Sequence, residues 1–230
     1  MTSEQESQLA SAVLMINPVR FESNPSTAAS NKFQGRNPDS SNKQQRDAAE
    51  EFVGLRSVLE TSGIEVIKVD DTAEPHTPDA IFPNNWVSFH ADGTVVLYPM
   101  EAPNRRTERR SDIIETLVED HEFVVRKIVD LSTHEAQAQY LEGTGSLVLD
   151  RVNRVAYACL SSRTHLDALG DFAQRMGYEV LAFDAHDRNG APIYHTNVLM
   201  SVGEALAGDG LAEVVDEDEE VAESDLVVAV

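Results

Sequence analysis

WVSFHADGTVVLY, residues 86–98, predicts a β-hairpin. Two runs rich in β-branched and aromatic residues flank Asp92-Gly93, and glycine reaches the positive φ that a tight hairpin turn requires. An amphipathic stretch and a second β-rich stretch follow, which predict a helix over 107–119 and a strand over 123–129. Hairpin, helix and strand, in this order, form the unit from which we expect the fold to be built.

The same unit recurs on both sides of this stretch, with helices that begin roughly 60 residues apart. Upstream, we expect a strand over 9–16, a helix over 42–61 with Ala49, Phe52, Val53 and Leu59 on its apolar side, Gly63 at its end, and a strand over 64–69. Downstream, we expect a hairpin of strands 146–149 and 154–160, a helix over 166–176 ended by Gly177, and a strand over 178–183. A strand over 198–202 begins a fourth unit, and the alternation predicts an α/β fold.

Two stretches lack this periodicity. Residues 21–46, rich in Asn, Ser, Gln and Pro, predict a long loop, which is either a binding lid or plain irregular structure. Ten acidic and no basic residues follow Gly203. We therefore expect one α/β domain over 1–203 and an acidic, disordered or frayed tail over 204–230.

Composition excludes several classes of partner. The net charge of −22, which is still −12 without the ten tail acids, disfavours nucleic acid and anionic membrane surfaces, since both are bound by lysine and arginine. No apolar stretch approaches the ~20 residues of a membrane helix, and the polar start is unlike a signal peptide. With 41% hydrophobic residues and one cysteine, the chain has the composition of a globular, cytoplasmic protein without internal disulfides.

His195 is the first candidate catalytic residue. His195-Thr196-Asn197-Val198-Leu199 sets a histidine at the mouth of a predicted strand, where alternation would point Asn197 to the same side. A histidine in such a position can transfer protons near neutral pH. The alternative interpretation is a histidine of the core.

Asp79-Ala80-Ile81-Phe82-Pro83-Asn84-Asn85-Trp86 is the second candidate stretch. Each asparagine offers a carbonyl acceptor and an amide donor, so paired asparagines suit a neutral, urea-like group, whereas two aspartates would suit a guanidinium. A turn that leads into a strand is the alternative interpretation.

Two further stretches complete the candidate site. Four of the 18 basic residues lie at positions 105, 106, 109 and 110, where an arginine fork could bind the carboxylate of an amino acid or simply pair with surface acids. Glu142-Gly143-Thr144-Gly145 sets a carboxylate beside glycines that let the backbone approach a ligand, or forms a turn. Cys159 lies in an apolar strand and is predicted to be a core thiol, and the histidine spacing predicts neither a metal site nor a cofactor.

Together these motifs resemble the guanidino-group modifying superfamily of amidinotransferases and arginine deiminases, most closely its citrulline hydrolase-like branch. The resemblance extends over about 9–203 and is carried by residues 15–18, 79–86, 98–100, 103–110, 141–146 and 195–200. It implies a five-bladed α/β propeller of ββαβ units around a polar centre, of which this chain would hold about four blades.

The resemblance also implies roles for single residues. His195 would be the general acid and base and Glu142 its acidic partner, while Asp79, Phe82, Asn84, Asn85 and Asn197 would bind substrate. Arg105 or Arg106 would bind the substrate carboxylate. Asn85 and Asn197 stand where arginine deiminases have aspartates, which favours neutral citrulline over arginine.

The family mechanism uses a C-terminal cysteine thiolate that attacks the central carbon of the substrate. This sequence has no cysteine after His195, so we expect a truncated or frame-shifted relative that is inactive as written. The predicted function is a hydrolase of ureido or guanidino carbon–nitrogen bonds with a small-molecule substrate. The alternatives are an inactive module that binds such amino acids, and an amidinotransferase; the oligomeric state is not predicted.

Overall fold

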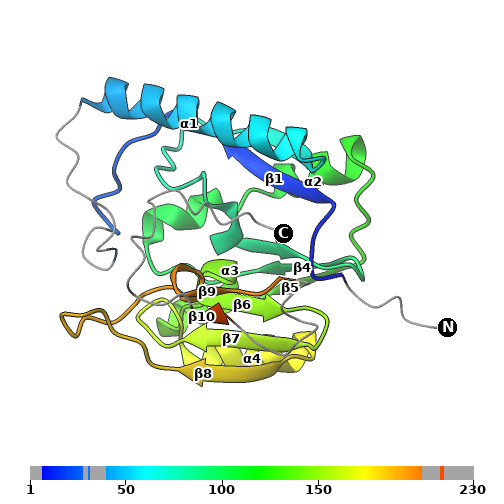
Figure 1. Cartoon of the computed structure of the whole chain (residues 1–230), viewed down its shortest axis with the longest axis vertical. Helices are drawn as coiled ribbons and strands as arrows, with labels where there is room; N and C mark the ends of the chain where they lie inside the picture. Colours follow the sequence, from blue (N-terminus) through cyan, green and yellow to red (C-terminus); the bar gives the residue numbers. More distant parts are fainter. Residues whose placement is uncertain (1–6, 28–30, 32–39, 204–212, 215–230) are drawn as a thin grey trace.

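Repeated strand–helix–strand units build the computed structural model, which describes residues 7–27, 31, 40–203 and the backbone of 213–214 (Figure 1). Its helices and strands are β1 (Ala12–Asn17), α1 (Ser41–Thr61), β2 (Glu65–Asp70), β3 (Val87–Phe89), β4 (Thr94–Leu97), α2 (Ser111–Asp120), β5 (Lys127–Asp130), α3 (Gly143–Ser146), β6 (Leu147–Asp150), β7 (Val155–Cys159), α4 (Leu166–Met176), β8 (Glu179–Phe183), β9 (Met200–Ser201) and β10 (Glu213–Val214). Short 3-10 turns lie at η1 (Pro83–Asn85), η2 (Pro103–Glu108), η3 (Ser132–Gln137) and η4 (Thr196–Val198).

Two three-stranded sheets share one topology. In β3-β4-β5 and again in β6-β7-β8, an antiparallel hairpin is followed by a helix and a third strand that runs parallel to the middle one. Gly93, at φ +81°, makes the predicted turn of the first hairpin. The strands β1 and β2, which α1 connects in the sequence, pair in parallel, and β9 pairs with β10 in antiparallel fashion. The mixed sheets confirm the predicted α/β class and the repeating unit.

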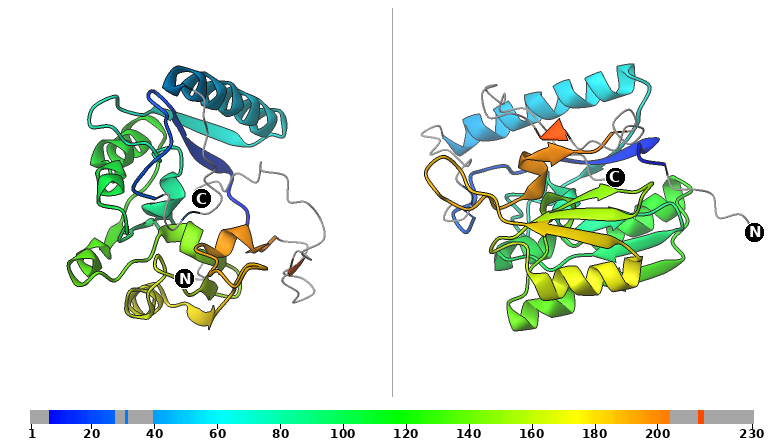
Figure 2. Two further views of the ribbon diagram at one scale, coloured as in Figure 1. Left: turned by 90° about the vertical axis from the view of Figure 1, so that its left-hand side faces the viewer. Right: turned by 60° about the horizontal axis from the view of Figure 1, so that its bottom comes forward.

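The units are arranged with their helices outward. In Figure 1, α1 runs along β1 at one end of the molecule, and α4 covers the sheet of β6, β7 and β8 at the other. The left view of Figure 2 shows α1, α2 and α4 at the periphery, with the short helix α3 and the turn η4 nearer the middle. The short turns therefore meet where the units converge.

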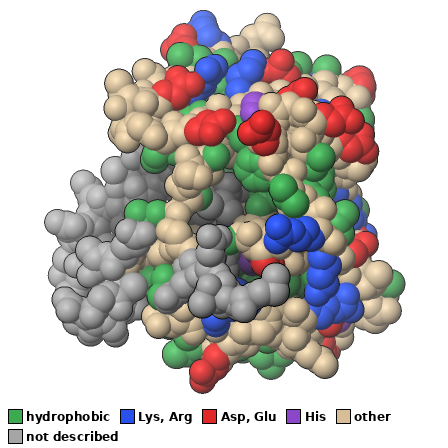
Figure 3. All heavy atoms as spheres, turned by 90° about the vertical axis from the view of Figure 1, so that its right-hand side faces the viewer, with side chains coloured by type: hydrophobic (Ala, Val, Ile, Leu, Met, Phe, Trp, Pro, Cys, Tyr) green, Lys and Arg blue, Asp and Glu red, His purple; other side chains and the backbone are tan. Residues whose placement is uncertain are grey.

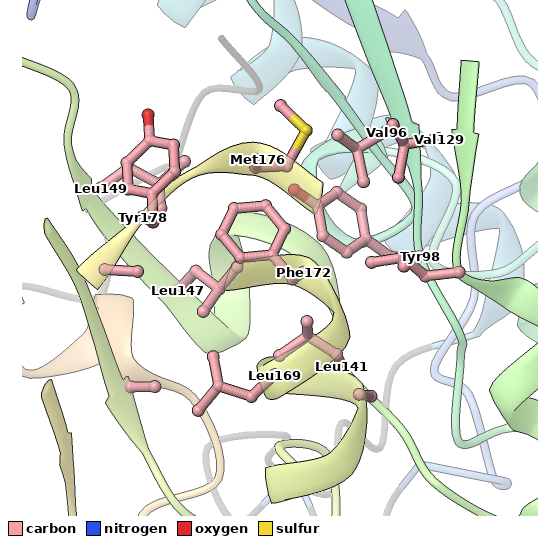
Figure 4. Close-up of a cluster of buried hydrophobic side chains, with 14 residues drawn as sticks. Val96, Tyr98, Val129, Leu141, Leu147, Leu149, Leu169, Phe172, Met176 and Tyr178 are labelled. Atoms are coloured by element: carbon pink, nitrogen blue, oxygen red, sulfur yellow. The ribbon is translucent and has the colours of Figure 1, made fainter. Parts of the chain in front are cut away.

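Each of two helices joins its own unit to the preceding one. Phe172 of α4 packs on Tyr98, which follows β4, with ring centroids 6.1 Å apart, and on Tyr178 at 5.5 Å (Figure 4). This cluster includes Val96, Val129, Leu147 and Leu169. In the same way, Ile113 and Leu117 of α2 pack with Leu14, Ile67 and Trp86 in a second cluster. Burial of these apolar side chains, at about 25 cal/mol per Å², is the main force that fixes one unit against the next.

Three of the differences between the predicted and the observed elements have a clear physical cause. The predicted helix over 107–119 is split, because Arg109 leaves the helical conformation and bonds to Glu135, and Arg110 is extended. α2 therefore begins only at Ser111. The predicted strand over 123–129 pairs only from Lys127, because its partner β4 begins at Thr94. On α1, Phe52 is buried as predicted, but Val53 is 63% exposed, since the buried stripe is narrower than the predicted apolar side.

The remaining predicted elements are present, but some of their ends differ. β1 begins at Ala12 rather than at residue 9, α1 begins at Ser41 within the predicted loop over 21–46, and β9 begins at Met200 rather than at residue 198. Helix α4 has the predicted bounds, and Gly63 and Gly177 have the positive φ values of +83° and +69° expected just beyond helix ends. No helix in the described ranges is both long and apolar enough to cross a membrane. The predicted acidic tail lies outside the described residues, except for the short strand β10.

Candidate functional site

Three short turns from different units bring the candidate residues together. Asn85 ends η1, Glu142 immediately precedes α3, and His195 immediately precedes η4. The turn α3 contacts both η1 and η4. Because Gly143 has φ +45°, and a Cβ built on it would lie 2.0 Å from the Asn84 carbonyl oxygen, only glycine fits there.

His195 and Glu142 form a buried acid–base pair. The His195 Nε2 lies 3.0 Å from Glu142 Oε2, and the two residues are 5% and 0% exposed. A carboxylate can only accept, so Nε2 carries the proton that it donates. Thr196 holds the two segments together, since its Oγ1 donates to the Ser146 carbonyl at 2.6 Å and accepts from the Cys159 N–H at 2.7 Å. The structure thus unites two residues that lie 53 positions apart.

The Glu142 carboxylate is surrounded by donors. Oε1 accepts from the Glu101 N–H at 3.1 Å, while Arg163 Nη1 lies 3.2 Å and Arg105 Nη1 3.8 Å from Oε2. Burial by itself raises the pKa of Glu142, but the hydrogen bond and charge of His195 and the two guanidinium charges outweigh it and lower the pKa to about 2. Glu142 is therefore ionised at neutral pH.

His195 is held in its neutral form. Burial lowers the pKa of its imidazole, and the charges of Arg163 and Arg105 lower it further. The hydrogen bond and charge of Glu142 raise the pKa, but by less. With Nε2 protonated and directed at Glu142, the other ring nitrogen, Nδ1, is the atom that can exchange a proton with a ligand. That nitrogen lies on the side of Gly145, where an added Cβ would be 2.8 Å away.

Arg105 organises the site from η2. It is 2% exposed, and its Nε and Nη2 donate to both carboxylate oxygens of buried Glu108 at 3.0 and 2.8 Å. Its Nη1 donates to Asn85 Oδ1 at 2.8 Å, which leaves the amide nitrogen of Asn85 facing Gly145 and His195. The Asp79 carboxylate lies 3.4 Å from Nε. All three guanidinium nitrogens therefore contact acceptors of the protein itself, so Arg105 links η2 to Asn85 and Asp79.

Arg106 lies on the other side of η2. It donates to the carbonyl oxygens of Met100 at 3.1 Å and Glu101 at 3.4 Å, and it pairs with Glu135 at 3.3 Å. Glu135 also accepts from Arg109 at 2.5 Å. These contacts join Arg106 to the segment after β4 and to η3. For both arginines, binding of a substrate carboxylate remains a prediction.

Part of the long loop reaches the site. Asn24 is 1% exposed; its Nδ2 donates to Asp79 Oδ2 at 2.6 Å, and its Oδ1 accepts from Asn104 Nδ2 at 2.9 Å. This chain of contacts fixes the Asp79 carboxylate beside Arg105. Phe82, whose N–H donates to the Asp79 carbonyl at 3.0 Å, turns the chain from Asp79 into η1.

Three polar atoms on the converging turns have no hydrogen-bond partner within the described part of the chain. They are Asn84 Oδ1, Thr144 Oγ1 and Asn197 Oδ1, and all three are buried atoms. A buried acceptor without a donor costs about 1–3 kcal/mol. All three belong to the converging turns η1, α3 and η4.

The backbone at His195 differs from the prediction. Residues 196–198 form the turn η4, and strand β9 begins only at Met200, so strand alternation does not place Asn197 beside His195. The turn forms because Thr196 bonds to Ser146 and Cys159 on two neighbouring segments. This tertiary contact overrides the extended pattern of the local sequence.

Four residues of the site were not predicted from the sequence: Asn24, Glu108, Arg163 and Tyr194. Arg163, 2% exposed, stands in a turn beyond β7 and reaches Glu142 and, at 3.3 Å, Glu101. No local motif marks it, because its burial depends on residues 20 or more positions away. Glu108 alone had a signal, three positions after Arg105 in a turn that pairs the two side chains.

Cys159 lies in the core, as predicted. It is 0% exposed, burial raises the pKa of its thiol, and its Sγ lies 3.6 Å from the Ile193 carbonyl oxygen. Among the described residues, no three His, Cys, Asp or Glu side chains are grouped as metal ligands.

A separate cavity of about 290 Å³ opens between β1 and β4. It is lined mainly by apolar side chains, together with Gln8, His90 and Arg151. Figure 3 shows the face on the right-hand side of Figure 1, with several hydrophobic side chains visible above its centre. In the cavity wall, Arg151 Nη1 lies 3.3 Å from the Phe89 carbonyl oxygen and 3.5 Å from His90 Nδ1. None of the cavity-lining residues belongs to the His195–Glu142 site.

Solved structures with the same fold include guanidino-modifying enzymes. The N-terminal domain of ArgZ, a cyanobacterial arginine dihydrolase, in a cysteine-to-serine variant bound to substrate, is 21% identical, with a TM-score of 0.58. The match covers 82% of this chain and 62% of that one. A dimethylarginine dimethylaminohydrolase adduct with S-methyl-L-thiocitrulline is 16% identical, with a TM-score of 0.59 over 85% of this chain and 67% of that one.

A ternary complex of AgrE with ornithine and NAD+ is 21% identical, with a TM-score of 0.60, over 84% of this chain and 26% of that one. This chain thus spans about three fifths of the ArgZ domain that it matches. At these identities the likeness establishes the fold. No curated protein matches the chain.

The family is established by a match that covers most of the sequence. The model of the family described as "N,N dimethylarginine dimethylhydrolase, eukaryotic" matches residues 17–227, a range that extends beyond Gly203. This match and the fold confirm the predicted membership of the guanidino-group modifying superfamily. The chain belongs to the N,N-dimethylarginine dimethylhydrolase family.

Proposed function

We propose that this chain supplies the acid–base pair and the polar binding groups of a hydrolase that cleaves a carbon–nitrogen bond in the ureido or guanidino group of an amino acid. The observation that carries the proposal is the His195–Glu142 contact of 3.0 Å, buried where three turns converge. Family membership and the shared fold support it.

The pair is suited to proton transfer during covalent catalysis. A thiolate attacks the central carbon of the substrate and forms a C–S bond; the C–N bond then breaks, and the amine leaves with a proton from the imidazole. Water hydrolyses the C–S bond and releases the thiol. Neutral His195 can take the thiol proton on Nδ1 and return it to the leaving nitrogen, while ionised Glu142 stabilises the transient imidazolium.

The polar groups suit a planar ligand rich in N–H groups. The unpartnered oxygens of Asn84, Thr144 and Asn197 can accept from such a ligand, and the amide nitrogen of Asn85 can donate to a ureido oxygen. Amides at positions 85 and 197 add no negative charge for a guanidinium. We therefore place citrulline first and arginine second as substrates.

The thiol of this mechanism is not Cys159. Cys159 is the single cysteine of the sequence and is fully buried. This observation favours a second candidate function for the chain by itself, which is to bind a ureido or guanidino amino acid without turning it over. Amidino transfer would require the same nucleophile.

We also infer that the units surround the site as about four blades of a propeller. The common topology of the two three-stranded sheets and the convergence of η1, α3 and η4 support this arrangement.

Calorimetry and an ammonia assay test the proposal together. L-Citrulline and L-arginine are titrated into the full chain and into the H195A variant, with H165A as the matched control, since the His165 side chain is 46% exposed. We expect saturable binding that H195A weakens about tenfold and H165A leaves unchanged, without ammonia release. Ammonia release that H195A abolishes would support catalysis by the chain itself. No binding of either amino acid would contradict both functions.

A further inference from the structure

The tyrosine next to the candidate general base contacts two members of the site at once. The ring of Tyr194 lies 4.6 Å, centroid to centroid, from the His195 imidazole, at an interplanar angle of 46°. The Arg163 guanidinium lies over the same Tyr194 ring, with its Cζ 4.8 Å from the centroid. Arginine stacks well on aromatic faces because its planar cation is weakly hydrated.

Both groups that touch this ring also reach one oxygen atom. His195 Nε2 lies 3.0 Å and Arg163 Nη1 lies 3.2 Å from Glu142 Oε2. The backbone of Tyr194 is itself fixed, because its carbonyl accepts from Ser161 Oγ at 2.8 Å, two residues before Arg163. The ring therefore stands on a fixed segment and contacts both donors of the same carboxylate.

We propose that Tyr194 is a positioning residue, whose ring holds the His195 imidazole and the Arg163 guanidinium against Glu142 Oε2. The assignment rests on the proposed function only in giving His195 its acid–base role. The guanidinium lies over the ring and the imidazole is tilted by 46° against it, so both contacts are made by the aromatic ring and not by the phenol oxygen. Phenylalanine should substitute for tyrosine, whereas a residue without a π face should not.

Titration of His195 reports on this role. The charged groups that face its ring are Glu142, Arg163 and Arg105, and burial together with the two arginines lowers the pKa of His195. Loss of the Tyr194 ring admits water and lets Arg163 move away, so both lowering influences weaken. The pKa of His195 should then rise toward its ordinary value.

The experiment measures the pKa of His195 by NMR of ¹⁵N-histidine-labelled chain, with the H195Q spectrum to assign the signal among seven histidines. We expect Y194A and Y194L to raise this pKa by about half a unit or more and Y194F to leave it unchanged. Y194L retains bulk, so it serves if Y194A does not fold. The matched control is Y178L, because Tyr178 lies under Arg154 at 4.3 Å in a similar stack outside the site.

An unchanged pKa in folded Y194L, or an equal rise in Y178L, would overturn the proposal. An equal rise in Y194F would overturn it as well, since the phenol would then be the operative group. No substrate is needed for this titration. Its failure is therefore distinguishable from failure of the proposed function, which the binding experiment decides.

Discussion

Gly145 leaves no space for a side-chain carbon beside His195: a Cβ built on Gly145 would lie 2.7 Å from the imidazole Cε1. The same carbon would lie 2.6 Å from the amide nitrogen of Asn85. The glycine therefore allows α3 to approach η1 and η4 closely enough for the acid–base pair to form.

Substitution of this glycine should disturb the site more than its size suggests. We expect G145A to lower the free energy of unfolding by about 1–3 kcal/mol, because the added methyl overpacks against His195 and Asn85. Urea denaturation measures this change. The matched control is G170A on the exposed side of α4, where nothing lies within 4 Å of the new Cβ. This variant should gain about 0.5–1 kcal/mol. If G145A is as stable as wild type, then α3, η1 and η4 can accommodate the added methyl group and the close packing at Gly145 is not required.

Stability should depend on pH through Glu142. Its pKa of about 2 in the folded chain is below the ordinary value of 4.5, so the unfolded chain takes up the proton first on acidification. The contribution of Glu142 is thus complete above pH 4.5 and is lost as the pH falls toward 2. We expect E142Q to be less stable than wild type by about 3 kcal/mol at neutral pH, and the difference to shrink in that acidic window.

Urea denaturation at about pH 7, 5 and 3.5 measures this dependence. E115Q is the control, since Glu115 is exposed on α2 and its loss should change stability by less than about 0.5 kcal/mol. A difference between E142Q and wild type that stays constant down to the lowest pH would mean that Glu142 is not held ionised by its donors.

The thiol of Cys159 should be unreactive in the folded chain. Burial excludes reagents from it and raises its pKa, so little thiolate forms at neutral pH. We expect a disulfide reagent such as DTNB to label it only after addition of urea, and C159A to bind citrulline as wild type does. Rapid labelling without denaturant would show that the Cys159 thiol is accessible and reactive enough to act as a nucleophile.

Much of the fold could be predicted from local sequence. The Asp92-Gly93 turn and the bounds of α4 are determined by residues only a few positions away, so the local sequence is enough to predict them. The break before α2 could not, because Arg109 is drawn out of the helix by Glu135, 26 positions away.

The candidate site, too, could be predicted only in part from the local sequence. The polar motifs around Asp79, Glu142 and His195 were visible as residue types that are unusual beside apolar strands. Their partners were not, since Asn24 reaches Asp79 over 55 positions and Arg163 reaches Glu142 over 21. Nor could the sequence tell that Arg105 also donates to Asn85, because that contact depends on how η2 meets η1.

The choice between citrulline and arginine should depend on the amide of Asn85. Its nitrogen can donate to a ureido oxygen, whereas an aspartate at the same place can only accept and suits a guanidinium. We expect the double variant N85D/N197D to shift the ratio of the two dissociation constants about tenfold toward arginine, measured by calorimetry. A ratio that does not move would show that these amides do not set the preference.

A ureido or guanidino amino acid is proposed to bind beside His195. The most direct measurement is the ¹⁵N-histidine NMR spectrum of the full chain during titration with L-citrulline and, separately, L-arginine. We predict that the His195 signal shifts and saturates, with the larger response at lower concentration for citrulline, while the exposed His165 signal stays in place. If the chain is folded and the His195 signal does not move with either amino acid at millimolar concentration, neither amino acid binds beside His195.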